Sequence, residues 1–191
     1  MSEYVRILEA IHAVKHLPRQ GWIEHGLDER RVETVGSHCF GTALLVVLLK
    51  EGGYLPGEVA FDQLLELALL HDIGESAIGD LTPAGDVPAA KKATMERDAV
   101  RSILHGVPGL DALASDLDVL VSGQNLQEMD PVHALVKQVD KLDMMLQALL
   151  YERDSGMDMS DFYGDPKKYL SDEQLLAFFE SSKRAVGLKN W

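Results

Sequence analysis

Cysteine is almost missing from this sequence of 191 residues, in which Cys39 is the only one. A single cysteine cannot form a disulfide within the chain, and disulfides are typical of oxidising compartments. We therefore expect a reducing compartment and a cytoplasmic protein. The first residues, MSEYVRILEAIHAVKHL, include acidic side chains and no uninterrupted apolar stretch, which argues against a secretory signal.

Basic side chains are also scarce. There are 18 lysines and arginines against 31 aspartates and glutamates, and the formal net charge is −13. Proteins that bind nucleic-acid polymers or anionic membranes need clustered lysines and arginines, so both kinds of partner are disfavoured. A small phosphorylated ligand is compatible with this charge, because one metal ion and one arginine can reverse the potential of a single site.

Long hydrophobic runs and strand patterns are missing as well. No stretch approaches the roughly 20 apolar residues that span a membrane, and runs of alternating β-branched residues do not occur. The chain shows helical periodicity instead, with no internal repeat and no linker long enough to separate domains. The sequence therefore predicts a single all-α domain over residues 1–191.

Several helix ends carry recognisable signals. Gly52 and Gly53 end a nearly all-apolar central helix, Asp62 is a good N-cap, and Asp130 followed by proline marks a helix start. Ser171 begins a capping-box pattern before the last helix. We predict helices over residues 3–16, 35–50, 62–72, 88–105, 109–122, 130–152 and 171–186.

Ionisable side chains interrupt the most apolar of these helices. His38 lies in the first turn of the central helix, His71 and Asp72 end another apolar run, and Asp140 sits inside a third. Burying such groups without partners costs several kcal/mol. Two imidazoles and two carboxylates form an N₂O₂ donor set, which suits one divalent transition-metal ion such as Mn, Co, Fe, Zn or Ni.

Each of these residues also has an ordinary structural explanation. His38 can be a surface or cap residue, His71 and Asp72 can form a helix-terminal pair, and Asp140 can pair with neighbouring lysines. Spacing alone leaves a metal site and these structural roles about equally open.

The order of these residues, together with the segments around them, favours the metal site. His38…His71-Asp72…Asp140 resembles the metal-binding signature of the HD-domain superfamily of metal-dependent phosphohydrolases. Four segments resemble successive blocks of its small 5′-deoxynucleotidases and cover most of residues 15–155: RQGWIEHGL…ETVGSHCFGTALL, LLHDIGESAIGDLTP, KKATMERDAV and LVKQVDKLDMMLQALLYE. The resemblance implies an all-α HD fold, one catalytic divalent cation on these four residues, a homodimer, and hydrolysis of deoxynucleoside 5′-monophosphates to deoxynucleoside and phosphate.

The resemblance also suggests roles for residues beside the metal ligands. Glu75 follows His71 by one helical turn and is expected to orient or deprotonate a water, while the family pattern adds Asp80 as a second acid–base group. Which of the two carboxylates takes the proton stays open. Arg19 is the expected phosphate ligand, because a guanidinium matches phosphate oxygens bidentately. Trp22 is expected to pack on the sugar or base.

Other segments are less informative. Lys92 and Glu96 match a family block, but their spacing of four also suits an exposed ion pair. Cys39 directly follows the first predicted ligand, so we expect it to be buried and to point away from the site. Residues 110–130 depart from the family pattern, which puts substrate contacts there in doubt. The C-terminal tail, residues 156–191, is expected to pack on the helical core or at a subunit interface.

Three other functions stay open. A cyclic-nucleotide phosphodiesterase of the superfamily has a lysine where this chain has Glu75, and extra histidines for a second metal. Here His133 precedes Asp140 by seven residues, about 10 Å along a helix, which disfavours a two-metal site. A nucleoside triphosphohydrolase is disfavoured because few basic residues flank the motif. In a non-catalytic module the metal would only staple the core, and Glu75 and Asp80 would be superfluous.

Overall fold

The computed structural model describes residues 2–55, 58–82, 85, 87–122 and 125–187. In this part of the chain the only strand-like pairing is an isolated bridge between Pro18 and Thr34, so the all-α prediction is confirmed. None of its helices has the length and apolar composition needed to cross a membrane. The helices are α1 (Glu3–Val14), α2 (Gln20–Glu24), α3 (Val35–Glu51), α4 (Phe61–Leu70), α5 (Glu75–Ile78), α6 (Ala89–Leu104), α7 (Asp111–Val121), α8 (Pro131–Ser155), α9 (Ser160–Tyr163) and α10 (Glu173–Val186), with 3₁₀ turns η1 (Glu29–Arg31) and η2 (Pro166–Lys168).

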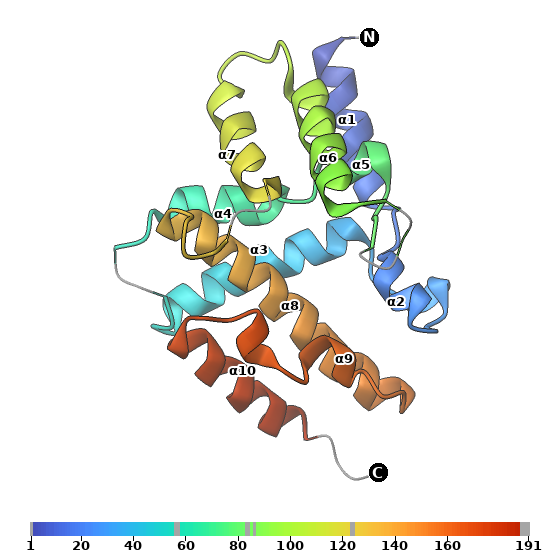
Figure 1. Cartoon of the computed structure of the whole chain (residues 1–191), viewed down its shortest axis with the longest axis vertical. Coiled ribbons are helices and arrows are strands. Elements are labelled where there is room, and N and C mark those ends of the chain that lie inside the picture. Colours follow the sequence, from blue (N-terminus) through green and yellow to red (C-terminus); the bar gives the residue numbers. More distant parts are fainter. Residues whose placement is uncertain (1, 56–57, 83–84, 86, 123–124, 188–191) are drawn as a thin grey trace.

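Helices α3, α4 and α8 form the centre of the molecule, and α3 crosses α8 (Figure 1). Helix α3 packs against both α4 and α8, which explains why its sequence is apolar nearly all round. Val46 and Leu49 of α3 and Leu142 and Leu149 of α8 are fully buried between these helices. Helices α1, α5, α6 and α7 cover one end of this centre, while α9 and α10 pack along α8 (Figure 1). The polar site residues therefore come from the helices with the most buried surroundings.

The helix starts and ends agree with most of the predicted signals. Gly52 is the C-cap of α3, and the Asp130 side chain accepts hydrogen bonds from the first N–H groups of α8. The predicted N-cap Asp62 is wrong, because α4 begins earlier and Ala60 is its N-cap. Asp62 lies inside the first turn instead, where its negative charge still interacts favourably with the helix dipole.

The N-cap of the last helix also differs from the prediction. The side chain of Asp172 accepts hydrogen bonds from the N–H groups of Gln174 and Leu175, whereas Ser171 does not cap α10. Ser171 is engaged elsewhere, because its N–H and its hydroxyl both donate to Oε1 of Gln138 in α8. This contact fastens the C-terminal tail to the central helix.

The C-terminal tail packs on the helical core, as predicted. Leu175 and Phe179 of α10 are fully buried, and so are Met159 and Leu170 in the segment before it. They join the apolar cluster that also contains residues of α1, α3, α4 and α8. The last part of the tail, residues 188–191, lies outside the described residues.

Candidate active site

The His71-Asp72 motif lies where α4 gives way to tight turns. Helix α4 does not continue through Gly74, and the N–H of Glu75 donates to the carbonyl of Asp72, three residues earlier. Gly74 suits this position because a Cβ there would lie 3.0 Å from the main-chain oxygen of Glu96 in α6. The tightened backbone brings His71, Asp72 and Glu75 to one cavity. Pro83, at the end of the same motif block, lies outside the described residues.

The four predicted metal ligands meet where α3, α4 and α8 come together. His38 Nε2 lies 3.2 Å from His71 Nε2 and 3.1 Å from Asp140 Oδ1. Asp72 Oδ2 lies 3.3 Å from His71 Nε2 and 3.8 Å from His38 Nε2. Atoms that bind one metal ion at about 2.0–2.2 Å stand roughly 3–4.4 Å apart. His38, His71 and Asp72 thus have the spacing of a metal site, and Asp140 borders it on the α8 side.

The outward-facing ring nitrogens of both histidines have partners of their own. His71 Nδ1 donates to the carbonyl of Ala68 at 2.9 Å, and His38 Nδ1 lies 2.8 Å from Asp143 Oδ2. Metal-binding histidines use such contacts to fix the ring and leave the other nitrogen for the ion. With two Nε2 atoms facing each other between carboxylates, these residues fit a divalent metal ion.

Asp143 is the partner of His38 that sequence reasoning left without a role. It lies three residues after Asp140 on α8, so both carboxylates reach the same imidazole. Gly41, three residues after His38 on α3, makes room for it, because a Cβ at Gly41 would lie 2.6 Å from Asp143 Oδ1. Glu33 is close to this pair as well, and the ligand atoms of Glu33, His38 and Asp143 lie within 4.8 Å of one another.

Charge is strongly coupled within the ligand cluster. Burial opposes a charge on His38, but hydrogen bonds to Asp140 and Asp143 raise its pKa to about 10. Burial also opposes the charge of Asp140, yet Lys141 and His38 hold the pKa of Asp140 well below its usual value. A bound metal ion would replace the proton on His38, because only a neutral imidazole is a ligand.

Arg19 is held beside the ligand cluster by three carboxylates. Its Nη1 lies 3.2 Å from Asp72 Oδ2, 3.6 Å from Asp80 Oδ1 and 3.8 Å from Glu75 Oε2. Burial would lower the pKa of Arg19, but these carboxylates, Asp72 first, raise it above its ordinary value. The N–H of Gln20 also donates to Asp80 Oδ2 at 2.7 Å, so the loop that carries Arg19 is fastened to the site at two points.

Glu75 is buried with few compensating contacts. Burial, followed by the charges of Asp72 and Asp80, raises the pKa of Glu75 to about 9. Within the described structure its Oε2 accepts no hydrogen bond, and its Oε1 lies 3.6 Å from Lys92 Nζ. A raised pKa favours the protonated form of Glu75, which suits a group that transfers protons.

Lys92 and Glu96 form the ion pair that their spacing allows, but it is not an exposed one. Lys92 Nζ lies 3.3 Å from Glu96 Oε1, with the two side chains 27% and 14% exposed. Lys92 also donates to the carbonyl of Leu81 and faces Glu75. The pair thus connects α6 to the motif turn.

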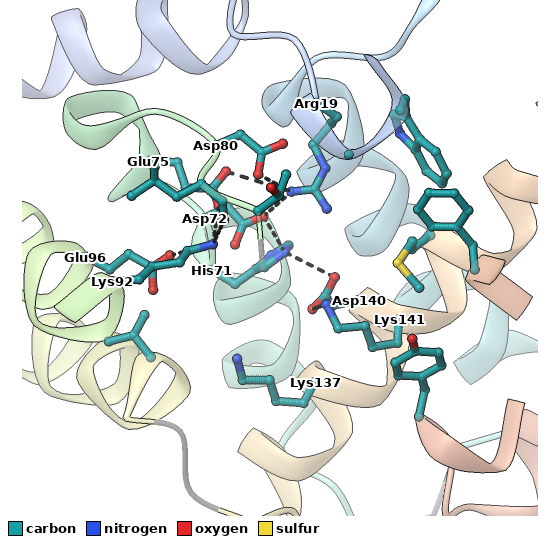
Figure 2. A pocket seen from close by; sticks show the side chains of 18 of the residues that line it. Arg19, His71, Asp72, Glu75, Asp80, Lys92, Glu96, Lys137, Asp140 and Lys141 are labelled. Carbon is teal, nitrogen blue, oxygen red and sulfur yellow. Dashed lines mark hydrogen bonds and ion pairs between the residues drawn. The ribbon is translucent and has the colours of Figure 1, made fainter. Parts of the chain in front are cut away.

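These residues border a cavity of about 620 Å³ (Figure 2). Its polar side is formed by Arg19, His71, Asp72, Glu75, Asp80, Lys92, Glu96, Lys137, Asp140 and Lys141. Its aromatic side is formed by Trp22, Phe162, Tyr169 and the thioether of Met144. All predicted site residues except His38 line the cavity, and His38 lies fully buried behind His71 and Asp140.

Trp22 is a buried wall residue rather than an exposed platform. It is 2% exposed, and its Nε1 donates to Glu33 Oε1 at 3.0 Å. Its ring packs against Tyr151 and Phe162, with centroids 5.2 and 4.4 Å away. Cys39 is buried as well, and it does not line the cavity.

Two further sequence expectations need revision. Lys137 and Lys141 line the cavity with Arg19 and Lys92, so basic residues are not scarce at the site. Lys137 and Lys141 lie three residues before and one residue after Asp140, and this proximity in the sequence could have indicated that they lie at the site. Residues 110–130 also reach the cavity, through the apolar side chains of Leu120 and Val121; residues 123–124 lie outside the described residues.

His133 is not part of this site. Its ring nitrogens contact the side chain of Asp130 and the carbonyl of Asp116. It is buried between the start of α8 and α7 and does not line the cavity. This placement agrees with the expectation from spacing that His133 is too far from Asp140 to share a metal.

The fold and the site define the class: an all-α protein with a His, His-Asp, Asp cluster on three central helices. The HD-domain family matches residues 11–176, so the chain belongs to this family. It is 27% identical to a 5′-deoxynucleotidase of Dictyostelium discoideum over 96% of this chain and 90% of that protein. It is 29% identical to a human 5′-deoxynucleotidase over 78% of this chain and 68% of that protein.

Solved structures share the fold. A conserved hypothetical protein from Pyrococcus furiosus is 26% identical, with a TM-score of 0.72 over 94% of this chain and 99% of that chain. A predicted metal-dependent phosphohydrolase from Magnetospirillum magnetotacticum is 20% identical, with a TM-score of 0.66 over 96% of this chain and 91% of that chain. At this lower identity the second likeness concerns the fold alone.

Proposed function

We propose that the protein is a metal-dependent 5′-deoxynucleotidase, which hydrolyses deoxynucleoside 5′-monophosphates to deoxynucleoside and phosphate. One observation carries the proposal: the donor atoms of the ligand cluster lie beside a half-buried arginine and two further carboxylates in one cavity. The names of the relatives from Dictyostelium discoideum and human support the choice of substrate.

In the proposed site, His38, His71, Asp72 and Asp140 hold one divalent transition-metal ion per chain, such as Mn, Co, Fe, Zn or Ni. When bound, this ion supplies a Lewis acid for a phosphate oxygen and lowers the pKa of a water molecule. The four residues come from α3, α8 and the turn that directly follows α4, so their geometry is set by the packing of the core before substrate arrives.

The chain's own residues bind the phosphate and move the protons. Arg19 offers its guanidinium to the phosphate oxygens, whose negative charge joins those of the surrounding carboxylates as partners. Hydrolysis breaks the bond between phosphorus and the 5′-oxygen, takes a proton from water and returns one to the leaving oxygen. Glu75 and Asp80, both within 4 Å of Arg19, supply the acid and base for these transfers.

The test is phosphate release from a panel of deoxy- and ribonucleoside 5′-monophosphates. We expect turnover that stops with a chelator, returns with one of several divalent ions, and is faster for the deoxy substrates. Equal turnover of ribo and deoxy substrates would remove the deoxy assignment and leave a phosphohydrolase. In parallel, Glu75→Gln should keep the metal and the fold and lose turnover. Unchanged turnover in this variant would show that Glu75 is not an acid or base of the reaction, whereas no turnover by the metal-loaded wild type would leave only a metal-stapled module.

A nucleoside triphosphohydrolase is the second candidate, and one observation favours it. Lys137 lines the cavity and forms no ion pair with another residue of the described segments, so it is available to bind a phosphate beyond the one at Arg19. The same panel separates the two activities when deoxynucleoside triphosphates are added. A triphosphohydrolase releases tripolyphosphate from them, whereas the proposed nucleotidase releases orthophosphate from the monophosphates.

We also propose that two copies of the chain form a homodimer. Apolar side chains that remain exposed lie in two helical stripes: Tyr4, Leu8 and Ile11 on α1, and Phe40, Leu44 and Leu48 on α3. Exposed apolar patches of this kind mark association surfaces. Light scattering should give the mass of a dimer, and Leu44→Glu should reduce it to that of a monomer if this face is the interface.

The remaining proposals concern domain organisation and location. We propose one HD domain over residues 1–191, since a common apolar cluster includes residues from α1 to α10. A reducing compartment such as the cytoplasm suits Cys39, which is a buried free thiol. Limited proteolysis that released a stable fragment would contradict the single domain.

A further inference from the structure

The C-terminal segment, whose sequence indicated only packing, reaches the cavity. Phe162 of α9 and Tyr169 after η2 line it, next to Met144 of α8. Figure 2 shows the aromatic side chains grouped on one side, across Arg19 and Asp140 from the other carboxylates. The cavity therefore has a charged half and an aromatic half, and two rings of the C-terminal segment help to form the aromatic half.

The aromatic side is held firmly in place. The ring centroid of Phe162 lies 4.4 Å from that of Trp22 and 5.1 Å from that of His25. His25 Nε2 lies 2.7 Å from the carbonyl of Asp158, which connects the end of α2 to the segment that leads into α9. Trp22 also lines the cavity but is only 2% exposed, whereas Phe162 and Tyr169 are half-buried.

This surface has the chemistry that a nucleobase requires. If the phosphate binds at Arg19, the sugar and base must occupy the rest of the 620 Å³ cavity. A planar neutral base gains little among buried carboxylates and lysines. On aromatic rings and a thioether it gains stacking and dispersion contacts.

We propose that Phe162, Tyr169 and Met144 form the surface on which the nucleobase of the substrate stacks. The proposal rests on the proposed nucleotidase function and names the residues that bind the non-reacting part of its substrate. Since every base has a π-face, stacking of this kind accepts purines and pyrimidines, and we expect tolerance of all four bases.

The test compares a nucleotide with the same sugar phosphate lacking a base. Phe162→Ala and Tyr169→Ala should each raise KM for deoxyadenosine 5′-monophosphate by about 5- to 100-fold, with kcat nearly unchanged, because the lost contact exists before and during reaction. KM for 2-deoxyribose 5-phosphate should change by less than about twofold. Phe162→Leu, which keeps apolar volume but removes the ring, should lie between wild type and Phe162→Ala.

Phe178→Ala is the matched control. Phe178 is also a half-buried phenylalanine of the C-terminal tail, but it packs on Tyr54, 5.1 Å between centroids, and does not line the cavity. The Phe178→Ala variant should leave KM unchanged for both the nucleotide and the base-free sugar phosphate. If Phe162→Ala raises KM equally for the nucleotide and the base-free sugar phosphate, or for neither, the stacking surface is wrong.

The two proposals fail in different ways. If the wild-type protein, loaded with metal, hydrolyses no phosphomonoester, the nucleotidase function is wrong, and equilibrium binding then tests the surface directly. Deoxyadenosine 5′-monophosphate should bind more tightly than 2-deoxyribose 5-phosphate, and Phe162→Ala should remove the difference. Equal affinity of the wild type for both compounds overturns the stacking surface.

Discussion

The two halves of the cavity are built by different means. On the polar side, buried ionisable groups hold one another within 4 Å, so each position depends on the charge of its neighbours. On the aromatic side, half-buried rings are positioned by packing against Trp22 and His25. Removing one charge from the first half leaves another buried without a partner, which is costly. Trimming a ring in the second half removes contact area in a graded way. Substitutions on the polar side should therefore cause large losses of metal binding or activity, whereas substitutions on the aromatic side should change substrate binding in proportion to the contact area that is lost.

The largest effect is expected from Asp140→Asn. It removes a negative charge from the ligand cluster and leaves Lys141, whose Nζ lies 3.1 Å from Asp140 Oδ2, without its partner. Metal content, measured by mass spectrometry on the purified protein, should fall well below one ion per chain. Phosphate release should drop to the level seen with a chelator.

Asp130→Asn is the control on the same helix. Asp130 caps α8 and does not line the cavity. Because asparagine is as good an N-cap as aspartate, this variant should keep the helix start and leave the metal content intact. Full metal occupancy in Asp140→Asn would show that the α8 carboxylate is not a ligand.

A smaller and more specific effect is expected at Gly41. Alanine in place of glycine inside a helix normally stabilises it, by about 1 kcal/mol. At Gly41 the added Cβ would lie 2.6 Å from Asp143 Oδ1 and must push this carboxylate away from His38. Gly41→Ala and Asp143→Asn should both weaken metal binding by about 10- to 100-fold, as titration calorimetry would measure.

The two variants also separate positioning from stability. Gly41→Ala should weaken metal binding but leave the melting temperature of the metal-free protein nearly unchanged. The higher helix propensity of alanine should offset the cost of displacing Asp143. If metal affinity is unchanged in Asp143→Asn, Asp143 serves the packing of α3 on α8 and does not orient His38.

A moderate effect on substrate binding is expected at Lys137. It is half-buried, lines the cavity and forms no ion pair with any residue in the described segments. Lys137→Ala should raise KM for a monophosphate by about 3- to 10-fold, the loss expected for the net free energy of one ordinary hydrogen bond. Lys91→Ala, on the exposed face of the same cavity-lining helix as Lys92, is the control and should have no effect.

A much larger effect of Lys137→Ala on triphosphates than on monophosphates would move the proposed function to the second candidate. Equal and small effects on both substrates would instead mean that the lysine adds only general positive charge to the cavity. The measurement is KM for both substrate classes under the same metal conditions.

The metal ligands could be predicted from the sequence, and Phe162 and Tyr169 could not, for a physical reason. A charged side chain inside an apolar helix is conspicuous because its burial is costly, and this made His38, Asp72 and Asp140 visible. Phe162 and Tyr169 stand in a sequence where aromatic residues are ordinary core material, so nothing separated a cavity wall from packing. Only the fold brings the tail beside α2 and α8.

Some local features escaped for a different reason. The turn between α4 and α5 has the same residue spacing as a continuous helix, so spacing did not reveal the break at Gly74. Asp62 and Ser171 are good capping residues by type, but packing chose Ala60 and Asp172. Asp143 shares the face of Asp140, yet its role depends on the close approach that Gly41 allows across to another helix. Such contacts between distant segments leave no periodic pattern.

The smallest effect on activity is expected at Trp22, which connects the two halves. Trp22→Phe keeps a ring against Phe162 and loses the hydrogen bond to Glu33, a half-buried carboxylate whose pKa is already raised by desolvation. Leaving this acceptor without its donor should cost about 1–2 kcal/mol, or roughly 3–6 °C in melting temperature for a chain of this size. KM for a nucleotide should change less than about threefold, because only 2% of the Trp22 surface is exposed and phenylalanine keeps a ring at this place in the cavity wall. Adding Glu33→Gln to Trp22→Phe should cost less stability than the two single changes together, since they remove the same bond. A large rise in KM without a loss of stability would instead place Trp22 in direct contact with the substrate, as its position in the sequence first suggested.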